Sequence, residues 1–233
     1  MTDIKNIIFD WDNTLFPFKE KYWESAHRKL FKAAYDLEEE ALDQFMVKYH
    51  EFDEQLWPKV HAHQLTIAEL REERLRLTLK HFGKPIDESE VKGFFAKFLL
   101  TLFDEICPDP VLLEAMQQLS KNYNIALLSN GGHVEQREKL RRAGFDGLFP
   151  TYISGETGFL KPDPRAFTHL LEKESFEASE TLMVGDLVEH DILPAQSLGL
   201  KTAYLGPKKA QEQTLNIGHW HNFLKLSSNK KGA

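Results

Sequence analysis

The segment Ile4-Lys5-Asn6-Ile7-Ile8-Phe9 runs directly into Asp10-Trp11-Asp12-Asn13-Thr14 near the N-terminus. A short apolar run followed by polar, turn-forming residues is typical of a buried strand that ends at a loop. We therefore expect a strand over residues 4–9, with Asp10 and Asp12 projecting into a crevice beyond its end. Unpaired buried carboxylates are costly, and a cation such as Mg²⁺, which prefers hard oxygen ligands, is the simplest compensation. A plain turn, with Asp10 at the surface, explains this stretch equally well when it is taken alone.

Composition restricts the class of protein. The chain has 233 residues, of which 42% are hydrophobic, and a formal net charge of −7. This length suits one large domain or a domain with an insertion, and the acidic balance argues against binding to a nucleic acid polymer. Cys107 is the only cysteine, which excludes an internal disulfide. We see no signal-peptide pattern and no apolar run near the roughly 18 residues of a membrane span, so we expect a cytoplasmic protein without a membrane partner.

Residues 16–106 show helical periodicity and no strand-like run. The clearest helix start is Thr66-Ile67-Ala68-Glu69, which has the pattern of a capping box. The first helix is expected to carry its apolar stripe on Trp23, His27, Leu30 and Ala34. The predicted helices cover residues 20–35, 38–52, 66–82 and 91–103. Four helices in one block predict a small helical bundle inserted after the first strand.

From residue 107 onward, apolar strand-like runs alternate with helical patterns. Asp109-Pro110 and Asp163-Pro164 each combine an N-cap residue with a proline at the first helical position. We expect strands over residues 124–128, 151–153, 181–184 and 202–205, and a short helix over 191–198. This alternation predicts an α/β fold, a Rossmann-like parallel sheet with helices on both faces. The predicted domains are a core of residues 1–15 and 107–225, an inserted helical domain of 16–106, and a disordered tail of 226–233.

The polar residues with chemical potential follow the predicted strands. In open α/β sheets the ligand crevice lies beyond the carboxyl ends of the strands. Ser129, Asn130 and Gly131 follow the second strand, and the Ser129 hydroxyl with the backbone N–H groups at the next helix start can bind an anion. Lys161, in the loop after the third strand, can contact a phosphate and offset repulsion between carboxylates.

The fourth strand ends in Gly185-Asp186, and Asp191 follows five residues later. Asp186 is placed to complete an oxygen cage around a metal ion. Asp191 can act through a water molecule or cap the short helix that follows. Two carboxylates, waters and a substrate phosphate are a common set of Mg²⁺ ligands.

Taken in order, these residues resemble the four motifs of the haloacid dehalogenase superfamily of aspartate-nucleophile hydrolases. The motifs stand here as Asp10-Trp11-Asp12-Asn13-Thr14, Ser129, Lys161, and Gly185-Asp186 with Asp191. The resemblance implies a Rossmann-like core and a mobile helical cap formed by residues 16–106.

The resemblance also implies a mechanism. Asp10 would be the nucleophile that becomes an aspartyl phosphate, and Asp12 the general acid and base. Mg²⁺ would be held by Asp10, the backbone carbonyl of Asp12 and Asp186, while Ser129 and Lys161 hold phosphoryl oxygens.

Asp12 distinguishes between branches of this superfamily. Its dehalogenases lack a carboxylate at this position, because a halide leaves without a proton whereas an alkoxide needs one. We therefore expect a phosphatase of a small phosphorylated metabolite, which resembles the pyrimidine 5′-nucleotidase type. An N-acylneuraminate-9-phosphatase or another sugar phosphatase remains an alternative. A sugar phosphomutase or a catalytically inactive binding protein on the same fold is a further alternative.

Overall fold

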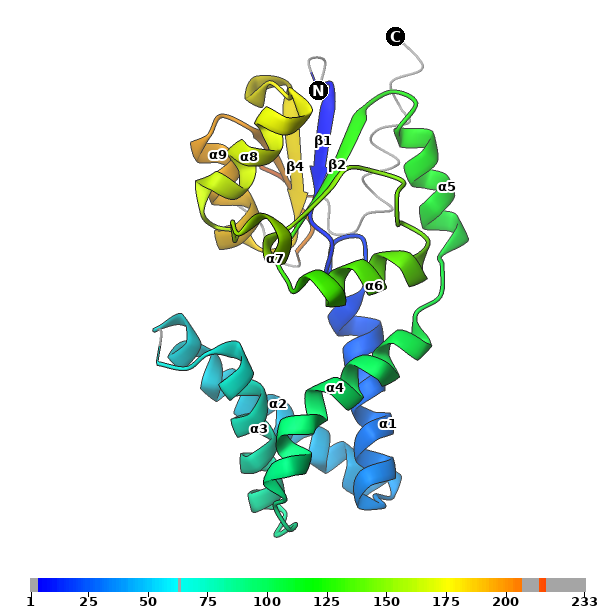
Figure 1. Ribbon diagram of the computed structural model, residues 1–233, viewed down its shortest axis with the longest axis vertical. Helices are drawn as coiled ribbons and strands as arrows, with labels where there is room; N and C mark the ends of the chain where they lie inside the picture. Colours follow the sequence, from blue (N-terminus) through cyan, green and yellow to red (C-terminus); the bar gives the residue numbers. More distant parts are fainter. Residues whose placement is uncertain (1–3, 63, 207–213, 217–233) are drawn as a thin grey trace. The chain divides into compact units, whose positions relative to one another are not determined.

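The computed structural model describes residues 4–62, 64–206 and 214–216 (Figure 1). The chain separates into two compact units. One unit is the segment Lys21–Glu105, which is helical, and the other is the rest of the described chain, which contains the sheet. The tail expected to be disordered, residues 226–233, lies outside the described residues. No helix in the described part of the chain is long and apolar enough to cross a membrane.

The sheet is parallel and has the order β3-β2-β1-β4-β5-β6. The central strand β1 pairs with β2 on one side and β4 on the other, so that Ile8 lies between Ala126 and Met183. This confirms the predicted Rossmann-like architecture. The short last strand was not predicted. The strands are β1 (Asn6–Phe9), β2 (Asn124–Ser129), β3 (Thr151–Ile153), β4 (Thr181–Gly185), β5 (Lys201–Tyr204) and β6 (Leu215–Asn216).

Two helices of the sheet unit begin where the sequence indicates. The side chains of Asp109 and Asp163 accept backbone N–H groups at the starts of α5 and α8. The predicted helix over 191–198 is instead a π-helical turn, Val188–Ile192, followed by α9, which has a proline in its first turn. The four-residue α7 was not predicted because it is too short to show periodicity. The helices are α5 (Pro110–Leu119), α6 (His133–Ala143), α7 (Ser154–Thr157), α8 (Pro164–Glu174) and α9 (Leu193–Ser197).

Both faces of the sheet are covered. On one face, Ile8 belongs to a buried cluster that includes Phe167 of α8 and Ala195 of α9. Alternation along the strand sends neighbouring side chains to the other face. There Trp11, beyond the strand end, contacts Phe145, which follows α6, with ring centroids 4.9 Å apart. Figure 1 shows α8 and α9 on one side of the sheet and α5 on the other.

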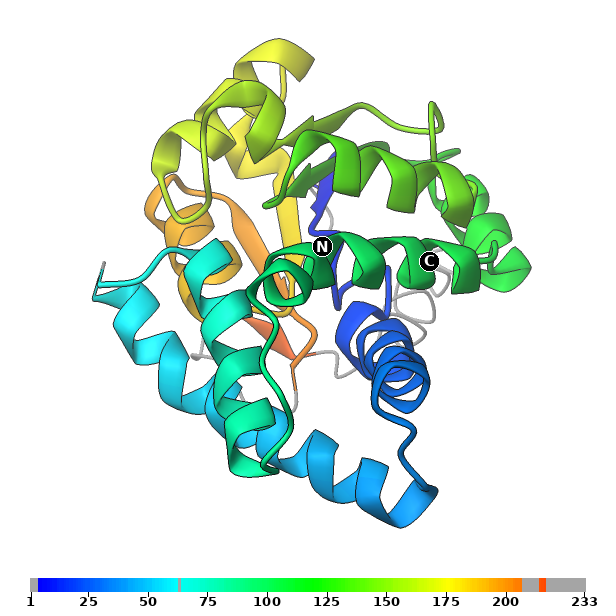
Figure 2. The same cartoon turned by 60° about the horizontal axis from the view of Figure 1, so that its bottom comes forward.

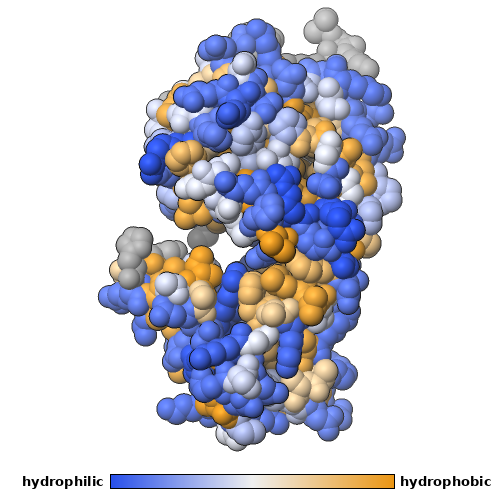
Figure 3. Space-filling view, viewed as in Figure 1, coloured by the Kyte–Doolittle hydropathy of each residue, from blue (hydrophilic) through white to orange (hydrophobic). Residues whose placement is uncertain are grey.

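The helical unit consists of α1 (Glu24–Tyr35), α2 (Glu39–His61), α3 (Ile67–His81) and α4 (Glu88–Glu105). Helix α2 pairs with α3, and α1 pairs with α4 (Figure 2). The predicted first helix is preceded by a π-helical turn, Phe18–Trp23, and its buried stripe is different from the prediction: Ala34 is exposed and Phe31 is buried. Apolar side chains also gather on the surface over α4 (Figure 3). Leu100 of α4 is 66% exposed.

Candidate active site

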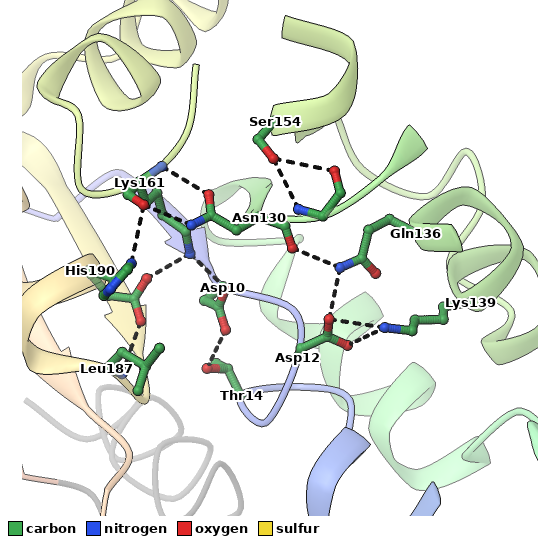
Figure 4. A network of polar contacts seen from close by, with 12 residues as sticks. Asp10, Asp12, Thr14, Asn130, Gln136, Lys139, Ser154, Lys161, Leu187 and His190 are labelled. Atoms are coloured by element: carbon green, nitrogen blue, oxygen red, sulfur yellow. Dashed lines mark hydrogen bonds and ion pairs between the residues drawn. The ribbon is translucent and has the colours of Figure 1, made fainter. Parts of the chain in front are cut away.

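A tight turn follows β1 and separates Asp10 from Asp12. The carbonyl oxygen of Trp11 accepts backbone N–H groups from Leu15 at 3.1 Å and Phe16 at 2.9 Å. Asn13 has a φ of 63°, a left-handed conformation that asparagine tolerates better than most residues. The Trp11 ring is buried and stacks on Phe16. Asp10 and Asp12, on either side of Trp11, instead lie among polar side chains (Figure 4).

Asp10 is part of a buried ion-pair group. Lys161 Nζ donates to Asp10 Oδ1 at 2.6 Å and to Asp191 Oδ1 at 2.6 Å. The hydroxyl of Thr14 donates to Asp10 Oδ2 at 2.9 Å, and the backbone N–H of Leu187 donates to Asp191 Oδ2 at 3.0 Å. All three charged residues are buried. Asp191 therefore braces Lys161 beside Asp10.

Gly185 makes room for Asp191. A Cβ atom on Gly185 would lie 2.4 Å from Asp191 Oδ2, so only glycine fits at the end of β4. Asn130 fixes the lysine loop from the other side. Its amide Nδ2 donates to the Lys161 carbonyl at 2.8 Å, and its Oδ1 accepts the Lys161 backbone N–H at 2.9 Å. The side chain of Asn130 thus orients the loop that presents Lys161.

The charges of this group suit a divalent cation. Ligand oxygens of Asp10, Asp186 and Asp191 lie within 4.8 Å of one another. Burial, with repulsion from the other two carboxylates, raises the pKa of Asp10 well above its usual value, although Lys161 opposes this. Burial and the charge of Asp191 also raise the pKa of Asp186 to about 6. When all three carboxyl groups are ionised, they and the one ammonium leave two negative charges in the site, which Mg²⁺ would neutralise with the oxygen ligands it prefers.

Lys161 remains the cation of the site. Burial acts to lower the pKa of Lys161, but the carboxylates of Asp10 and Asp191 outweigh it and raise the pKa above its usual value. The lysine is therefore charged at neutral pH and can neutralise an anion next to Asp10.

The predicted anion-binding loop is only partly free. Ser129 ends β2, and its hydroxyl is buried without a hydrogen-bond partner among the described residues. The backbone N–H of Gly131 donates to Ser154 Oγ at 2.9 Å, so this donor already has a partner within the protein. Ser154 belongs to α7, the helix that was not predicted.

Asp12 contacts two residues that were not predicted to belong to the site. Gln136 Nε2 donates to Asp12 Oδ2 at 2.7 Å, and Lys139 Nζ lies 3.1 Å from the same oxygen. Both residues are on α6 and buried. A spacing of three residues puts Gln136 and Lys139 on one face of a helix that begins just beyond a strand end. This spacing is the sequence feature from which both residues could have been predicted.

Comparison with known proteins places this site in a family. The sequence profile of the haloacid dehalogenase-like hydrolases matches residues 4–199. The chain is a haloacid dehalogenase-like hydrolase. It is 26% identical to the HAD-hydrolase YfnB of Bacillus subtilis, over 89% of this chain and 86% of that protein. A crystal structure of YfnB bound to magnesium has a TM-score of 0.79 and 22% identity, covering 99% of each chain.

Other relatives in this family carry the names of phosphatases. The chain is 28% identical to a glyceraldehyde 3-phosphate phosphatase of Methanopyrus kandleri, over 90% of this chain and 87% of the relative. It is 27% identical to the pyrimidine 5′-nucleotidase YjjG of Escherichia coli, over 85% of this chain and 84% of the relative.

Proposed function

We propose that this hydrolase is a Mg²⁺-dependent phosphatase of a small phosphorylated metabolite. Asp10 Oδ attacks phosphorus, the bond between phosphorus and the leaving oxygen breaks, and Asp12 gives that oxygen its proton. Water then attacks the aspartyl phosphate, Asp12 takes the proton of this water, and inorganic phosphate leaves from Asp10. The observation that carries the proposal is a buried Asp10 fixed beside Lys161, with a second carboxylate two residues later.

The surrounding residues bind the phosphoryl group. Lys161 neutralises one phosphoryl oxygen, and the Ser129 hydroxyl donates to another. Asp10, the Asp12 backbone carbonyl and Asp186 would hold Mg²⁺, which when bound neutralises charge on the transferring group. Asp191 does not touch the substrate in this scheme, because its role is to hold Lys161 in place.

Asp12 favours phosphate over halide chemistry. A structural neighbour, the L-2-haloacid dehalogenase of Xanthobacter autotrophicus, has a TM-score of 0.60 and 22% identity over 90% of this chain and 80% of that structure, a likeness of fold alone. Halide departs without protonation, so an acid next to the leaving atom has no use there. An alkoxide leaving group needs that proton, which supports a phosphatase.

We propose a nucleoside 5′-monophosphate as the first substrate class to test. Among the relatives, the nucleotidase supports this class, and the glyceraldehyde 3-phosphate phosphatase supports small sugar phosphates as the alternative. An N-acylneuraminate 9-phosphate belongs to the same alternative. A phosphomutase and an inactive binding protein rank below these. We propose that neither a nucleic acid polymer nor a membrane is a partner of this protein. We also propose that the protein is cytoplasmic.

Release of inorganic phosphate tests the proposal. The enzyme should hydrolyse 4-nitrophenyl phosphate with Mg²⁺ and lose activity with a chelator, and a panel of nucleotides and sugar phosphates then ranks the substrates. Asp10→Asn should abolish turnover while the circular dichroism spectrum stays unchanged. Full activity of this variant would refute the aspartyl-phosphate mechanism, and isomerised phosphate without phosphate release would favour the mutase.

A further inference from the structure

The carboxylate of Asp12 is held by one helix. In Figure 4 the Asp12 side chain points toward Gln136 and Lys139 of α6, whereas Asp10 faces Thr14 and Lys161. Asp12 Oδ2 accepts from Gln136 Nε2 at 2.7 Å and from Lys139 Nζ at 3.1 Å, and Asp12 Oδ1 lies 3.2 Å from the same ammonium. The two carboxylates of the first loop are thus anchored by different parts of the fold.

Lys139 is fixed in a place where lysine is rarely found. Its side chain is 0% exposed, whereas the side chains of Arg137 and Arg141 on the same helix are 37% and 59% exposed. The ammonium is 2.9 Å from Glu135 Oε1 and 3.9 Å from the centroid of the Phe18 ring. Contacts from Asp12, Glu135 and Phe18 therefore leave the ammonium little freedom to move.

Gln136 is held just as firmly. Its Nε2 also donates to the carbonyl of Asn130 at 2.9 Å, so the amide spans the loops after β1 and β2. Its side chain lies across Gly131, where a Cβ atom would come within 2.5 Å of Gln136 Nε2. The missing side chain at Gly131 opens the path by which Gln136 reaches Asp12.

These contacts leave the Asp12 carboxylate able to transfer a proton. A carboxylate offers about four acceptor positions. Gln136 and Lys139 occupy both positions of Oδ2 and one of Oδ1, which leaves one position on Oδ1 for a transferable proton. The Asp12 side chain is 22% exposed, so it is anchored on one side and open on another.

We propose that Gln136 and Lys139 are positioning residues that hold the Asp12 carboxylate where it passes a proton to the leaving oxygen. Proton transfer requires the acid within about 2.6–3.2 Å of that oxygen, and a carboxylate free to rotate would spend little time there. This inference rests on the proposed phosphatase function, because it assigns partners to the acid in that mechanism.

A leaving-group comparison separates positioning from general structure. The value of kcat/KM is measured for 4-nitrophenyl phosphate, whose phenolate leaves with little need of a proton, and for phenyl phosphate, whose phenol has a pKa near 10. Lys139→Met and Gln136→Leu should each lower kcat/KM for phenyl phosphate by about tenfold or more, but for 4-nitrophenyl phosphate by less than about threefold. An equal fall for both substrates, or no fall for either, would overturn the inference.

Glu138→Gln is the matched control. Glu138 lies on the same helix as Lys139 and Gln136, but its carboxylate pairs with Arg141 and Arg142. The ratio of the two kcat/KM values should stay near that of the wild type. If thermal unfolding shows that Lys139→Met does not fold, Gln136→Leu alone decides. Gln136 contacts the same Asp12 carboxylate, and its replacement does not remove a buried charge.

The Asp12→Asn variant distinguishes a wrong inference about Gln136 and Lys139 from a wrong proposed function. This variant should show the largest selective loss on phenyl phosphate. If it shows no selectivity, Asp12 is not the acid and the proposed mechanism fails. If Asp12→Asn is selective while Lys139→Met and Gln136→Leu are not, only the positioning role is wrong.

Discussion

Asp186 lies beside two other carboxylates, and this environment makes metal binding depend on pH. Its pKa is raised to about 6, mainly by burial, so protons compete with Mg²⁺ for the site below that pH. Apparent Mg²⁺ affinity should therefore fall as the pH is lowered from 8 to 5, and binding near pH 6 should release protons. Calorimetric titrations in two buffers of different ionisation enthalpy measure this release.

The same shift has a defined effect on stability. The folded protein binds the Asp186 proton more tightly than the unfolded chain, in which the pKa is near 3.9. Without metal, this residue therefore makes the protein less stable as the pH rises from about 4 to 6, and saturating Mg²⁺ should cancel that loss. Asp186→Asn should remove this part of the pH dependence. A metal affinity independent of pH would contradict the assignment of this carboxylate.

The residues that the sequence predicted are those whose position follows from a rule about strands. Asp10 and Asp186 directly follow β1 and β4, and Lys161 lies in the loop beyond β3 and α7. Parallel strands bring their carboxyl ends to one edge. Lys139 could not be predicted in this way, because helical periodicity normally assigns a lysine to the solvent face. The engagement of the Gly131 N–H was missed for another reason, since its partner Ser154 lies on a helix of only four residues.

At the scale of elements, the end of β4 must remain free of a side chain. Gly185→Ala places a Cβ atom 2.4 Å from the Asp191 carboxylate, so Asp191 must move and Lys161 loses its brace. We expect kcat/KM to fall by at least about tenfold and the free energy of unfolding to fall by about 1–3 kcal/mol. Gly93→Ala is the control, because a Cβ atom on Gly93 meets nothing within 4 Å. Unchanged activity of Gly185→Ala would show that the brace is unnecessary.

The start of α3 offers a second test at this scale. The Thr66 hydroxyl accepts the backbone N–H of Glu69 at 3.2 Å, and Glu69 Oε2 accepts the backbone N–H of Thr66 at 2.8 Å. Thr66→Ala removes half of this capping box and should lower the stability of the helical unit by about 1 kcal/mol. Thr101→Ala, inside α4, should be neutral or slightly stabilising because alanine is the better helix former. Urea-induced unfolding of both variants makes the comparison, and equal effects would argue against the cap.

Element starts and ends were predictable where a side chain marks them. Thr66, Asp109 and Asp163 cap their helices as the sequence indicates. The two π-helical turns were not predictable, because their residues continue the periodicity of the helix that follows. In α1, Phe31 is buried and Ala34, which was expected to be buried, is exposed. Three- and four-residue spacing allows two adjacent stripes on the same helix, and the stripe that carries the larger Phe31 ring faces the core.

At the scale of the whole chain, the candidate site draws on residues far apart in sequence. Asp10 precedes the helical unit, whereas Lys161 and Asp191 follow it, and β1 enters the sheet between β2 and β4. The central strand therefore depends on pairing with segments more than a hundred residues away. All candidate metal ligands nevertheless belong to the unit that contains the sheet.

This confinement predicts where Mg²⁺ stabilises the protein. A ligand that binds only the folded state at 100 times its Kd adds about 2.7 kcal/mol of stability. Hydrogen exchange with and without Mg²⁺, in the absence of substrate, should show slower exchange in peptides covering β1, β4 and the turn Val188–Ile192. Peptides from α2 and α3 should exchange at unchanged rates. Asp10→Asn should weaken the protection because it removes one negatively charged ligand. Protection that appears mainly in α2 and α3 would contradict the assignment of the metal ligands to the unit that contains the sheet.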